Sequence, residues 1–326
     1  MDVKKWIEKE AKIFTDSLLA YLPEGKPEKL YRAINHLPSA GGKRIRPLLS
    51  FLTCEAVGGT PSDTVPYGVA LEIIHTFTLI HDDLMDHDEE RRGLPSVHAL
   101  FGEDTAILAG DALFAKAFEV VSQTPVKDSI LTHLIRDLSR MTQEICEGQQ
   151  LDMDFEYRDD VSVNDFMEMI DKKTAKMFEY AAYGGALIGG ASQNVAESLR
   201  QYGKNLGLAF QIWDDCLDLV GDDTLGKPLG SDIREGKKTP VYIHALQYLP
   251  SKDQKIVARI FGNKSASKND IQSVISLLKK TGSISYAGSQ ASKFVSQACD
   301  SLEILRESTA KNMLLQIASY AIERKK

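Results

Sequence analysis

The chain has few of the features that assign a protein to a class at first sight. Its four cysteines, Cys54, Cys146, Cys216 and Cys299, lie far apart and form no CxxC pair. That spacing favours buried free thiols in a reducing compartment over a disulfide framework or a zinc site. There is also no run of 18 apolar residues and no apolar signal-peptide core. We therefore expect a cytoplasmic protein with no stable membrane insertion.

Positive charge is also scarce. The 39 lysines and arginines are outnumbered by 46 aspartates and glutamates, which gives a formal net charge of -7. No overall positive field is then available to attract nucleic acid, and we expect no nucleic-acid partner. A phosphorylated small substrate is still compatible with this charge, because a local basic cluster or a bound metal can reverse the sign within a cleft.

Alternating strand patterns are absent, and the dominant hydrophobic period is 3.6 residues, which is typical of helices. The composition, 43% hydrophobic and 26% charged over 326 residues, is that of a globular protein. We predict an all-α fold, a large helical bundle with residues 1–326 forming a single domain. The polar stretch 251–270 is expected to be a loop within it. Helices are expected near 6–19, 45–57, 66–86, 104–121, 127–147, 161–190, 195–220 and 238–249, with three more toward the C-terminus.

Two aspartate triplets with identical spacing lie in apolar helical segments. A single triplet has an ordinary explanation, a solvated helix end. Two copies behind apolar lead-ins are harder to explain so, because like charges one turn apart repel and carboxylates near a core need a compensating cation. Mg²⁺, which binds carboxylates together with substrate phosphates, meets both needs. The predicted metal ligands are Asp82, Asp83 and Asp86 in the first triplet and Asp214, Asp215 and Asp218 in the second.

Clusters of basic residues accompany the triplets. The segment GGKRIRP (41–47) places three cations after a glycine pair at a predicted helix start, a good position for binding an anion, although it could also be a solvated turn. Arg91 and Arg92 follow the first triplet, while Lys173, Lys227 and Lys237 flank the second in sequence. Clusters of both signs, each beside a glycine turn, favour metal-bridged binding of a polyphosphate.

In these motifs the chain closely resembles the trans-isoprenyl diphosphate synthases, also called polyprenyl synthases. The resemblance covers residues 40–245 in the right order, and no motif residue is missing. It implies a helical bundle around a central cavity, usually a homodimer, that condenses isopentenyl diphosphate with an allylic diphosphate head to tail. The matching segments are GGKRIRP (41–47), EIIHTFTLIHDDLMD (72–86), ERRG (90–93), GQQLD (148–152), KKTA (172–175), GLAFQIWDDCLD (207–218) and GKPLGSDIREGKKT (226–239).

The resemblance also implies roles for individual residues. The two triplets are expected to hold three Mg²⁺ ions on the allylic diphosphate, with Asp82, Asp86 and Asp214 the strongest candidates for direct ligands. The allylic diphosphate site is completed by Arg91, Lys173, Lys227 and Lys237. The isopentenyl diphosphate site matches Lys43, Arg46, His75 and Arg92, with Arg44 as an additional candidate. Thr174, the carbonyl of Lys173, and Gln211 are candidates to stabilise the allylic cation.

The reaction itself needs no protein nucleophile, and we find no Ser–His–Asp or Cys–His constellation. Heterolysis of an allylic C–O bond releases a highly charged diphosphate, which Mg²⁺ and cationic side chains stabilise as charge develops. The departing diphosphate can take the final proton, so no general base is assigned. His81 and His87 are expected to be supporting or surface residues.

Product length should depend on residues one turn or more before Asp82, which can form the floor of an apolar tunnel. Phe77 is bulky enough to block a growing tail and Thr78 is not, while Ile74 and Leu71 are secondary stops. Ordinary core packing would explain Phe77 equally well by periodicity. In the resembling family an aromatic here, with no insertion in the first motif, is typical of enzymes that stop at geranylgeranyl diphosphate, C20. Farnesyl diphosphate, C15, is the second hypothesis.

Two other readings remain open. A terpene cyclase also ionises allylic diphosphates with DDxxD and Mg²⁺, but it would not need the Lys43, Arg46 and His75 site and normally has a different second metal motif. A non-catalytic helical scaffold would leave the paired triplets and basic turns as coincidence.

Overall fold

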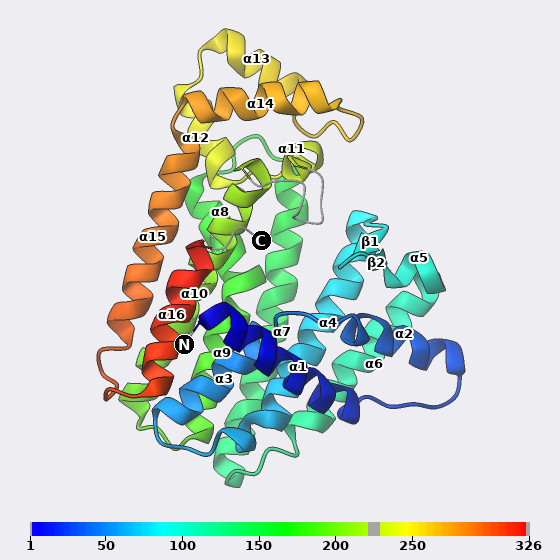
Figure 1. The fold of residues 1–326 in the computed structure, drawn as a ribbon. Helices are drawn as coiled ribbons and strands as arrows, with labels where there is room; N and C mark the ends of the chain where they lie inside the picture. The colour runs from blue at the N-terminus through cyan, green and yellow to red at the C-terminus, as the bar shows by residue number, and fades with distance from the viewer. Residues whose placement is uncertain (1, 221–228, 324–326) are drawn as a thin grey trace. The chain divides into compact units, whose positions relative to one another are not determined.

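The computed structural model describes residues 2–220 and 229–323 and confirms the all-α fold class (Figure 1). Within these residues no helix is both long and apolar enough to cross a membrane. The larger helices are α1 (Val3–Tyr21), α2 (Glu28–Ser39), α3 (Ile45–Ala56), α4 (Val65–Asp86), α6 (Glu103–Val121), α7 (Asp128–Glu156), α8 (Val163–Ile170), α9 (Lys176–Ile188), α10 (Gln193–Val220), α12 (Pro240–Tyr248), α13 (Ser251–Ile260), α14 (Lys268–Lys280), α15 (Ser283–Ser301) and α16 (Thr309–Glu323). Shorter elements are the 3₁₀ turn η1 (Pro61–Thr64), the π-turn η2 (Asp171–Ala175), α5 (Val97–Phe101), α11 (Ser231–Glu235) and the strands β1 (Glu90–Arg91) and β2 (Leu94–Pro95).

The contacts divide the chain into two compact units that are discontinuous in sequence. Unit 1 contains residues 1–142, 180–200 and 302–316, and unit 2 contains residues 143–179, 201–301 and 317–326. Residues of α7, α9, α10 and α16 are divided between the two units. The single domain over residues 1–326 and its central cavity stay predictions.

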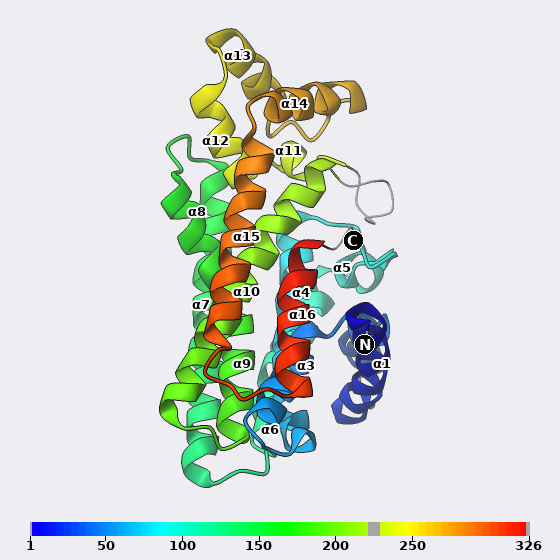
Figure 2. The same ribbon diagram turned by 60° about the vertical axis from the view of Figure 1, so that its left-hand side comes forward.

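Unit 1 is organised around α4, which packs against α3 and α6 and runs beside α6 in both views (Figures 1 and 2). Pro66 occupies the first turn of α4, where a missing N–H costs no helical hydrogen bond. The helix ends at Asp86, because His87 adopts the left-handed conformation (φ 58°) and donates its backbone N–H to the carbonyl of Asp83. The first aspartate triplet therefore lies in the last turns of a buried helix.

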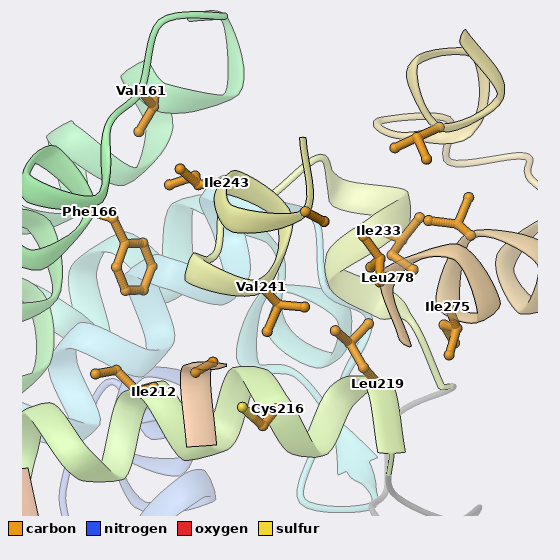
Figure 3. Packing of buried hydrophobic residues seen from close by; sticks show 14 of the residues in the cluster. Val161, Phe166, Ile212, Cys216, Leu219, Ile233, Val241, Ile243, Ile275 and Leu278 are labelled. Carbon is orange, nitrogen blue, oxygen red and sulfur yellow. The ribbon is translucent and has the colours of Figure 1, made fainter. Parts of the chain in front are cut away.

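Unit 2 has a core that one face of α10 shares with α8, α11, α12, α14 and α15. Ile212, Cys216 and Leu219, spaced like one stripe of a helix, point into this core beside Val241 (Figure 3). Ile233, Ile275 and Leu278 extend it (Figure 3). Burial of this stripe fixes the rotation of α10 about its axis, and with it the direction in which the second triplet points.

Two features of the sequence reading were wrong. The predicted helix at 161–190 is interrupted by the π-turn η2 between α8 and α9. The stretch 251–270, predicted to be a loop, contains α13, because Ile256, Val257 and Ile260 form a short apolar stripe after Pro250. Helix α2 and the β1–β2 hairpin were not predicted at all, since both are short and rich in polar residues.

The four cysteines are free thiols, as predicted. Cys54 and Cys216 are buried, and burial raises their pKa values to about 11 and about 12, which keeps them protonated. The prediction of burial was wrong for Cys146, which is exposed on α7, whereas Cys299 is half-buried.

Candidate active site

The first triplet combines one buried carboxylate with two that are accessible. The side chain of Asp83 is fully buried, while Asp82 and Asp86, one helical turn apart on the same face of α4, are half-buried. Negative charge at a helix C-terminus is opposed by the helix dipole, so this position needs cations. Burial raises the pKa of Asp83, although its hydrogen bond with Arg91 works in the opposite direction. The two outer carboxylates are the ones placed to bind a ligand.

Arg91 supplies the nearest cation. Its Nε donates to Asp83 Oδ1 over 2.7 Å, and its Nη2 makes a second contact with the same oxygen. Nη2 also lies 3.8 Å from Asp82 Oδ2 and 3.6 Å from Asp88 Oδ2. Arg91 is thus a counter-ion of the first triplet, at the position where the sequence predicts a diphosphate contact.

The ERRG motif places Arg91 and Arg92 on a tight hairpin. Glu90 pairs with Pro95 and Arg91 with Leu94, which leaves Arg92 and Gly93 as a two-residue turn. Both turn residues have positive φ, 58° and 74°, as a type I′ turn requires and as its glycine favours. Arg92 contacts the carbonyl of Gly41, and its guanidinium covers Gly42, where an added Cβ would lie 3.1 Å from Nη1. The hairpin therefore joins the ERRG and GGKRIRP motifs.

Arg46 is a further cation of unit 1 and is hydrogen-bonded to His75. Arg46 Nη1 donates to His75 Nε2 over 3.2 Å, which assigns the accepting, neutral form to that nitrogen. Burial, and then the charges of Arg46 and Arg92, lower the pKa of His75 well below its usual value. His75 lies seven residues before Asp82, two turns or about 10 Å along the same face of α4. Lys43, the remaining predicted member of this site, is exposed just before α3.

Arg44 is placed differently from the other basic residues of its motif. Its side chain is fully buried, and Nη1 lies 2.5 Å from Oε1 of the equally buried Glu72. The same guanidinium donates to Thr15 Oγ1 over 3.1 Å and to the Pro38 carbonyl over 2.7 Å. These contacts tie α1, α2 and α4 to the start of α3. Arg44 is engaged within the protein, and its contribution to isopentenyl diphosphate binding stays a prediction.

The second triplet follows the same design in unit 2. Asp215 is buried, Asp218 half-buried and Asp214 exposed. Burial, followed by the nearby charge of Asp232, raises the pKa of Asp215 well above its usual value. Burial also raises the pKa of Asp218. Asp218 accepts hydrogen bonds from the Ser231 hydroxyl (2.7 Å) and from the backbone N–H groups of Ser231 and Asp232 at the start of α11. Asp218 is therefore held by the start of α11, and Asp214 is the exposed member of the triplet.

Lys237 is the cation of this cluster. It lies 2.8 Å from Glu235 and 3.8 Å from Asp232. Burial by itself would lower the pKa of Lys237. The negative charges of Asp232 and Glu235 raise it by more than burial lowers it, so the pKa is well above its usual value. Lys237 is therefore charged, as binding of a diphosphate requires. The predicted partner Lys227 lies outside the described residues.

A chain of hydrogen bonds links the π-turn to the second triplet. Thr174 Oγ1 donates to Gln211 Oε1 over 2.8 Å, and Gln211 Nε2 donates to Asp215 Oδ1 over 3.0 Å. On the other side of the turn, Lys173 Nζ lies 2.5 Å from Asp152 Oδ2 on α7. The structure thus joins Thr174 to Gln211 and Lys173 to Asp152, and the roles of Lys173, Thr174 and Gln211 in catalysis stay predictions.

The donor atoms suit a hard divalent cation. Asp83 Oδ2 and Asp215 Oδ2 are buried and find no hydrogen-bond partner among the described residues. Burial raises the pKa of one or two carboxyls in each triplet, which is the cost that a bound cation would offset. No group of three or more His, Cys, Asp or Glu side chains in residues 2–220 and 229–323 could hold a metal by itself. A metal here would need oxygen ligands from a substrate, as Mg²⁺ sites with phosphates usually have.

The predicted floor residue Phe77 belongs to a row of aromatic rings. Its ring centroid lies 5.6 Å from that of Phe114 on α6, which in turn lies 5.2 Å from Phe118. His81 packs edge-on against Phe77 and approaches α6 at Gly110, where an added Cβ would lie 2.1 Å from Nε2. Close approach of α4 to α6 therefore brings two phenylalanines from different helices together.

The other predicted chain-length residues differ in accessibility. Ile74 and Leu71 are fully buried, whereas Thr78 is half-buried and donates its hydroxyl to the His75 carbonyl over 2.9 Å. His87 is exposed and caps α4, in agreement with its predicted surface role. The roles of these residues in product length stay predictions.

Four residues of the site had no role assigned from the sequence. Asp152 and Asp232 stand inside matching motifs, and a signal was present for Asp232, a carboxylate in a segment with conspicuous glycines and lysines. Glu72 was detectable as a lone charge within the apolar run of α4, which requires a buried partner. Phe114 has no local signal, because its meeting with Phe77 depends on how α6 packs.

Comparison with known proteins extends the likeness beyond the motifs. The family model described as polyprenyl synthetase matches residues 27–278. The geranylgeranyl diphosphate synthase of Methanosarcina mazei is 43% identical over 304 residues, which cover 93% of this chain and 92% of that protein. The short chain isoprenyl diphosphate synthase of Methanothermobacter thermautotrophicus is 44% identical over 325 residues, 99% of each chain. The crystal structure of geranylgeranyl pyrophosphate synthetase from Pyrococcus horikoshii matches with a TM-score of 0.93 and 42% identity, over 99% of this chain and 98% of that one. The likeness thus includes the last eighty residues, for which no motif was found.

Proposed function

Since the chain belongs to the polyprenyl synthetase family, we propose that it is a short-chain prenyltransferase that condenses isopentenyl diphosphate with allylic diphosphates to make geranylgeranyl diphosphate. One observation carries the proposal. Arg46 of α3 donates to the neutral His75, and Arg46 and Arg92 place positive charge beside the face of α4 that carries Asp82 two turns later. Two anion-binding regions on one helix suit an enzyme with two diphosphate substrates. A terpene cyclase takes one diphosphate substrate and would not need the region around Arg46 and His75.

The allylic diphosphate is assigned to the two triplets and the cations beside them. Asp82, Asp86 and Asp214, the accessible members, would hold three Mg²⁺ ions together with the diphosphate oxygens. When bound, Mg²⁺ supplies Lewis-acid stabilisation of the departing diphosphate. Asp83 and Asp215 lie behind the accessible carboxylates and orient their neighbours through Arg91 and Gln211. Arg91, Lys173 and Lys237 are the cations that neutralise the leaving group as its charge develops.

The cation left on the allylic fragment needs dipoles that do not react with it. Thr174 and Gln211 are hydrogen-bonded to each other, so their oxygens are oriented before substrate binds and cost no reorganisation during the reaction. Lys43, Arg46, His75 and Arg92 hold isopentenyl diphosphate. A neutral His75 keeps its accepting nitrogen on Arg46 and so turns the guanidinium toward the anion. Formation of the new C–C bond leaves a cation on the isopentenyl unit, and the proton lost from the adjacent carbon passes to the released diphosphate.

The function is tested by supplying labelled isopentenyl diphosphate, an allylic primer and Mg²⁺, and then sizing the extracted products. We expect an elongated C20 diphosphate, with activity lost in EDTA and restored by Mg²⁺. Hydrocarbon or alcohol formed without consumption of isopentenyl diphosphate would identify a cyclase. No product at all would favour the non-catalytic helical scaffold. A C15 end product would replace the proposed chain length while retaining the reaction.

Arg46→Gln should raise KM for isopentenyl diphosphate about 30- to 150-fold, because a charge-assisted hydrogen bond to an anion contributes about 2–3 kcal/mol. KM for the allylic substrate should stay within about twofold, since the triplets are unchanged. Steady-state kinetics with each substrate varied separately measures both. Arg32→Gln, which removes an exposed arginine of unit 1 stacked on Phe101, is the control. Equal rises in both KM values would contradict the assignment.

Phe77→Ala should lengthen the product beyond C20, because it removes one of the two rings that meet between α4 and α6. Chromatography of the dephosphorylated products measures the length. Phe77→Tyr keeps the ring and should retain C20. An unchanged product from Phe77→Ala would show that Phe77 is ordinary core.

We also propose that the protein works in the cytoplasm as a homodimer, the arrangement that the family resemblance implies. Sedimentation equilibrium of the purified chain should give twice the mass of 36.1 kDa. A monomer with full activity would remove the dimer from the proposal.

A further inference from the structure

The π-turn η2 is the one place in the described part of the helix from α8 to α9 where the backbone widens. The N–H of Lys176 bonds to the carbonyl of Asp171, five residues back instead of the usual four. Wide turns of this kind are rare and need support from their surroundings. This turn carries Lys173 and Thr174, so its shape decides where two predicted active-site groups point.

The neighbouring helices approach the turn at glycines. A Cβ on Gly148 of α7 would lie 2.3 Å from the backbone nitrogen of Lys173, and a Cβ on Gly207 of α10 would lie 2.6 Å from the Cα of Ala175. No other residue type fits at such distances. Helices α7 and α10 therefore both pack closely on the turn, with backbone against backbone.

An ion pair spans the same turn. Lys176 Nζ lies 3.6 Å from Asp171 Oδ2, so these residues are joined through both backbone and side chains. In a regular α-helix residues five apart point about 140° away from each other, which separates their side chains. In a π-turn, residues five apart point in more similar directions, so the side chains of Asp171 and Lys176 can meet. The pair is therefore compatible with the π-turn and opposes its conversion to a regular helical turn.

Charged residues from the neighbouring helices complete the arrangement. Lys204 of α10, one turn before Gly207, lies 3.3 Å from Asp171 Oδ2. Glu144 of α7, one turn before Gly148, lies 4.0 Å from Lys176 Nζ, and the buried Glu179 lies 2.9 Å from it. Each neighbouring helix thus contributes one charged and one glycine contact. We call this set the turn clamp: Glu144, Gly148, Asp171, Lys176, Glu179, Lys204 and Gly207.

The residues that meet the reaction lie one more turn along the same helices. Asp152, four residues after Gly148, holds Lys173, and Gln211, four residues after Gly207, holds Thr174. A change in the turn would move Lys173 and Thr174 relative to both partners. On both α7 and α10, the residue that contacts the turn is therefore followed, one helical turn later, by the residue that holds Lys173 or Thr174.

We propose that Lys176, through its ion pair with Asp171, is a positioning residue that keeps the π-turn wide and so holds Lys173 and Thr174 against the allylic diphosphate. The inference rests on the proposed function. The side chain of Lys176 is 13% exposed and is paired with Asp171, Glu179 and Glu144, so we expect it to act through the backbone of the turn and not by contact with substrate.

Lys176→Gln is the test. It should lower kcat on the order of tenfold or more and raise KM for the allylic diphosphate, because displacement of positioned groups by about 1 Å is costly. KM for isopentenyl diphosphate should stay within about twofold, since that site belongs to unit 1. Lys176→Arg, which keeps the charge, should restore most of kcat. Calorimetric titration of the allylic diphosphate with Mg²⁺, without isopentenyl diphosphate, should show the same loss of affinity.

Lys172→Gln is the matched control. Lys172 stands in the same turn and makes two ion pairs, 2.8 Å to Glu147 and 3.4 Å to Glu168, but neither spans the turn. We expect its kcat and both KM values to be unchanged. Asp171→Asn removes the other half of the pair at nearly constant volume and should reproduce Lys176→Gln. The double variant should be no slower than either single one. If Lys176→Gln does not fold, Asp171→Asn with its allylic KM decides the question.

The outcomes separate the two proposals. An active wild type with Lys176→Gln indistinguishable from Lys172→Gln overturns the positioning role alone. Equal rises in both KM values, or no recovery with Lys176→Arg, would show a general loss of structure and also overturn it. A wild type that consumes no isopentenyl diphosphate overturns the proposed function first.

Discussion

Replacing Asp82 with asparagine is expected to lower kcat/KM for the allylic substrate about 10²- to 10³-fold, the loss typical of removing one group that stabilises developing charge. Asp82 is accessible and one turn from Asp86, whereas Asp83 beside it is buried against Arg91. The amide has the same shape as the carboxylate but no charge, so the loss reports on cation binding and not on packing.

The measurement is steady-state kinetics over a range of Mg²⁺ concentrations. If Asp82 is a metal ligand, the variant should need more Mg²⁺ for half-maximal activity, and isopentenyl diphosphate should bind as before. Glu89→Gln, an equal change of charge at an exposed residue just beyond α4, should behave as wild type. Full activity of Asp82→Asn at ordinary Mg²⁺ concentrations would remove the first triplet from the mechanism.

Arg44→Met should cost about 3–5 kcal/mol of unfolding free energy, because it leaves the carboxylate of Glu72 buried without its partner. The side chains are 0% and 3% exposed, so solvent screens little of this interaction. The guanidinium also holds Thr15 and the Pro38 carbonyl, and their hydrogen bonds would be lost together. Urea denaturation followed by circular dichroism measures the change.

The double variant Arg44→Met/Glu72→Met is the control for this interpretation. Removing both charges avoids the unpaired carboxylate, and its stability should exceed that of Arg44→Met although more polar contacts are gone. A double variant that is less stable than Arg44→Met would show that packing of the arginine stem, and not its charge, decides the effect. Arg44→Lys should lie between wild type and Arg44→Met, since an ammonium cannot reproduce the fork of contacts.

The sequence predicted the parts of this site that depend on spacing along one helix. The two triplets were identified from helical spacing, because a helix repeats every 3.6 residues and places the first and last aspartate of each triplet on one face. His75 and the order of the motifs were assigned only by the family resemblance. Thr174 and Gln211 were named only from the family resemblance, and the hydrogen bond between them was not predicted.

The parts that were missed depend on packing or on backbone geometry. The π-turn includes the motif KKTA. A π-turn of five residues has no periodic pattern in the sequence that distinguishes it from an ordinary α-helix. The burial of Arg44 amid otherwise accessible cations follows from its left-handed backbone (φ 49°), which turns its side chain away from those of its neighbours. Helix α13 was missed because lysines and asparagines dominate the stretch around a narrow apolar stripe.

The β1–β2 hairpin has a consequence for how this protein can change. Its two adjacent arginines make different contacts, since Arg91 contacts the aspartates of α4 and Arg92 contacts the glycine pair before α3. A point substitution alters one of these contacts, but an insertion or deletion of one residue would exchange their directions and disturb both at once. Loop length is usually the freest property of a protein surface. Here, between Glu90 and Pro95, it should be among the most constrained.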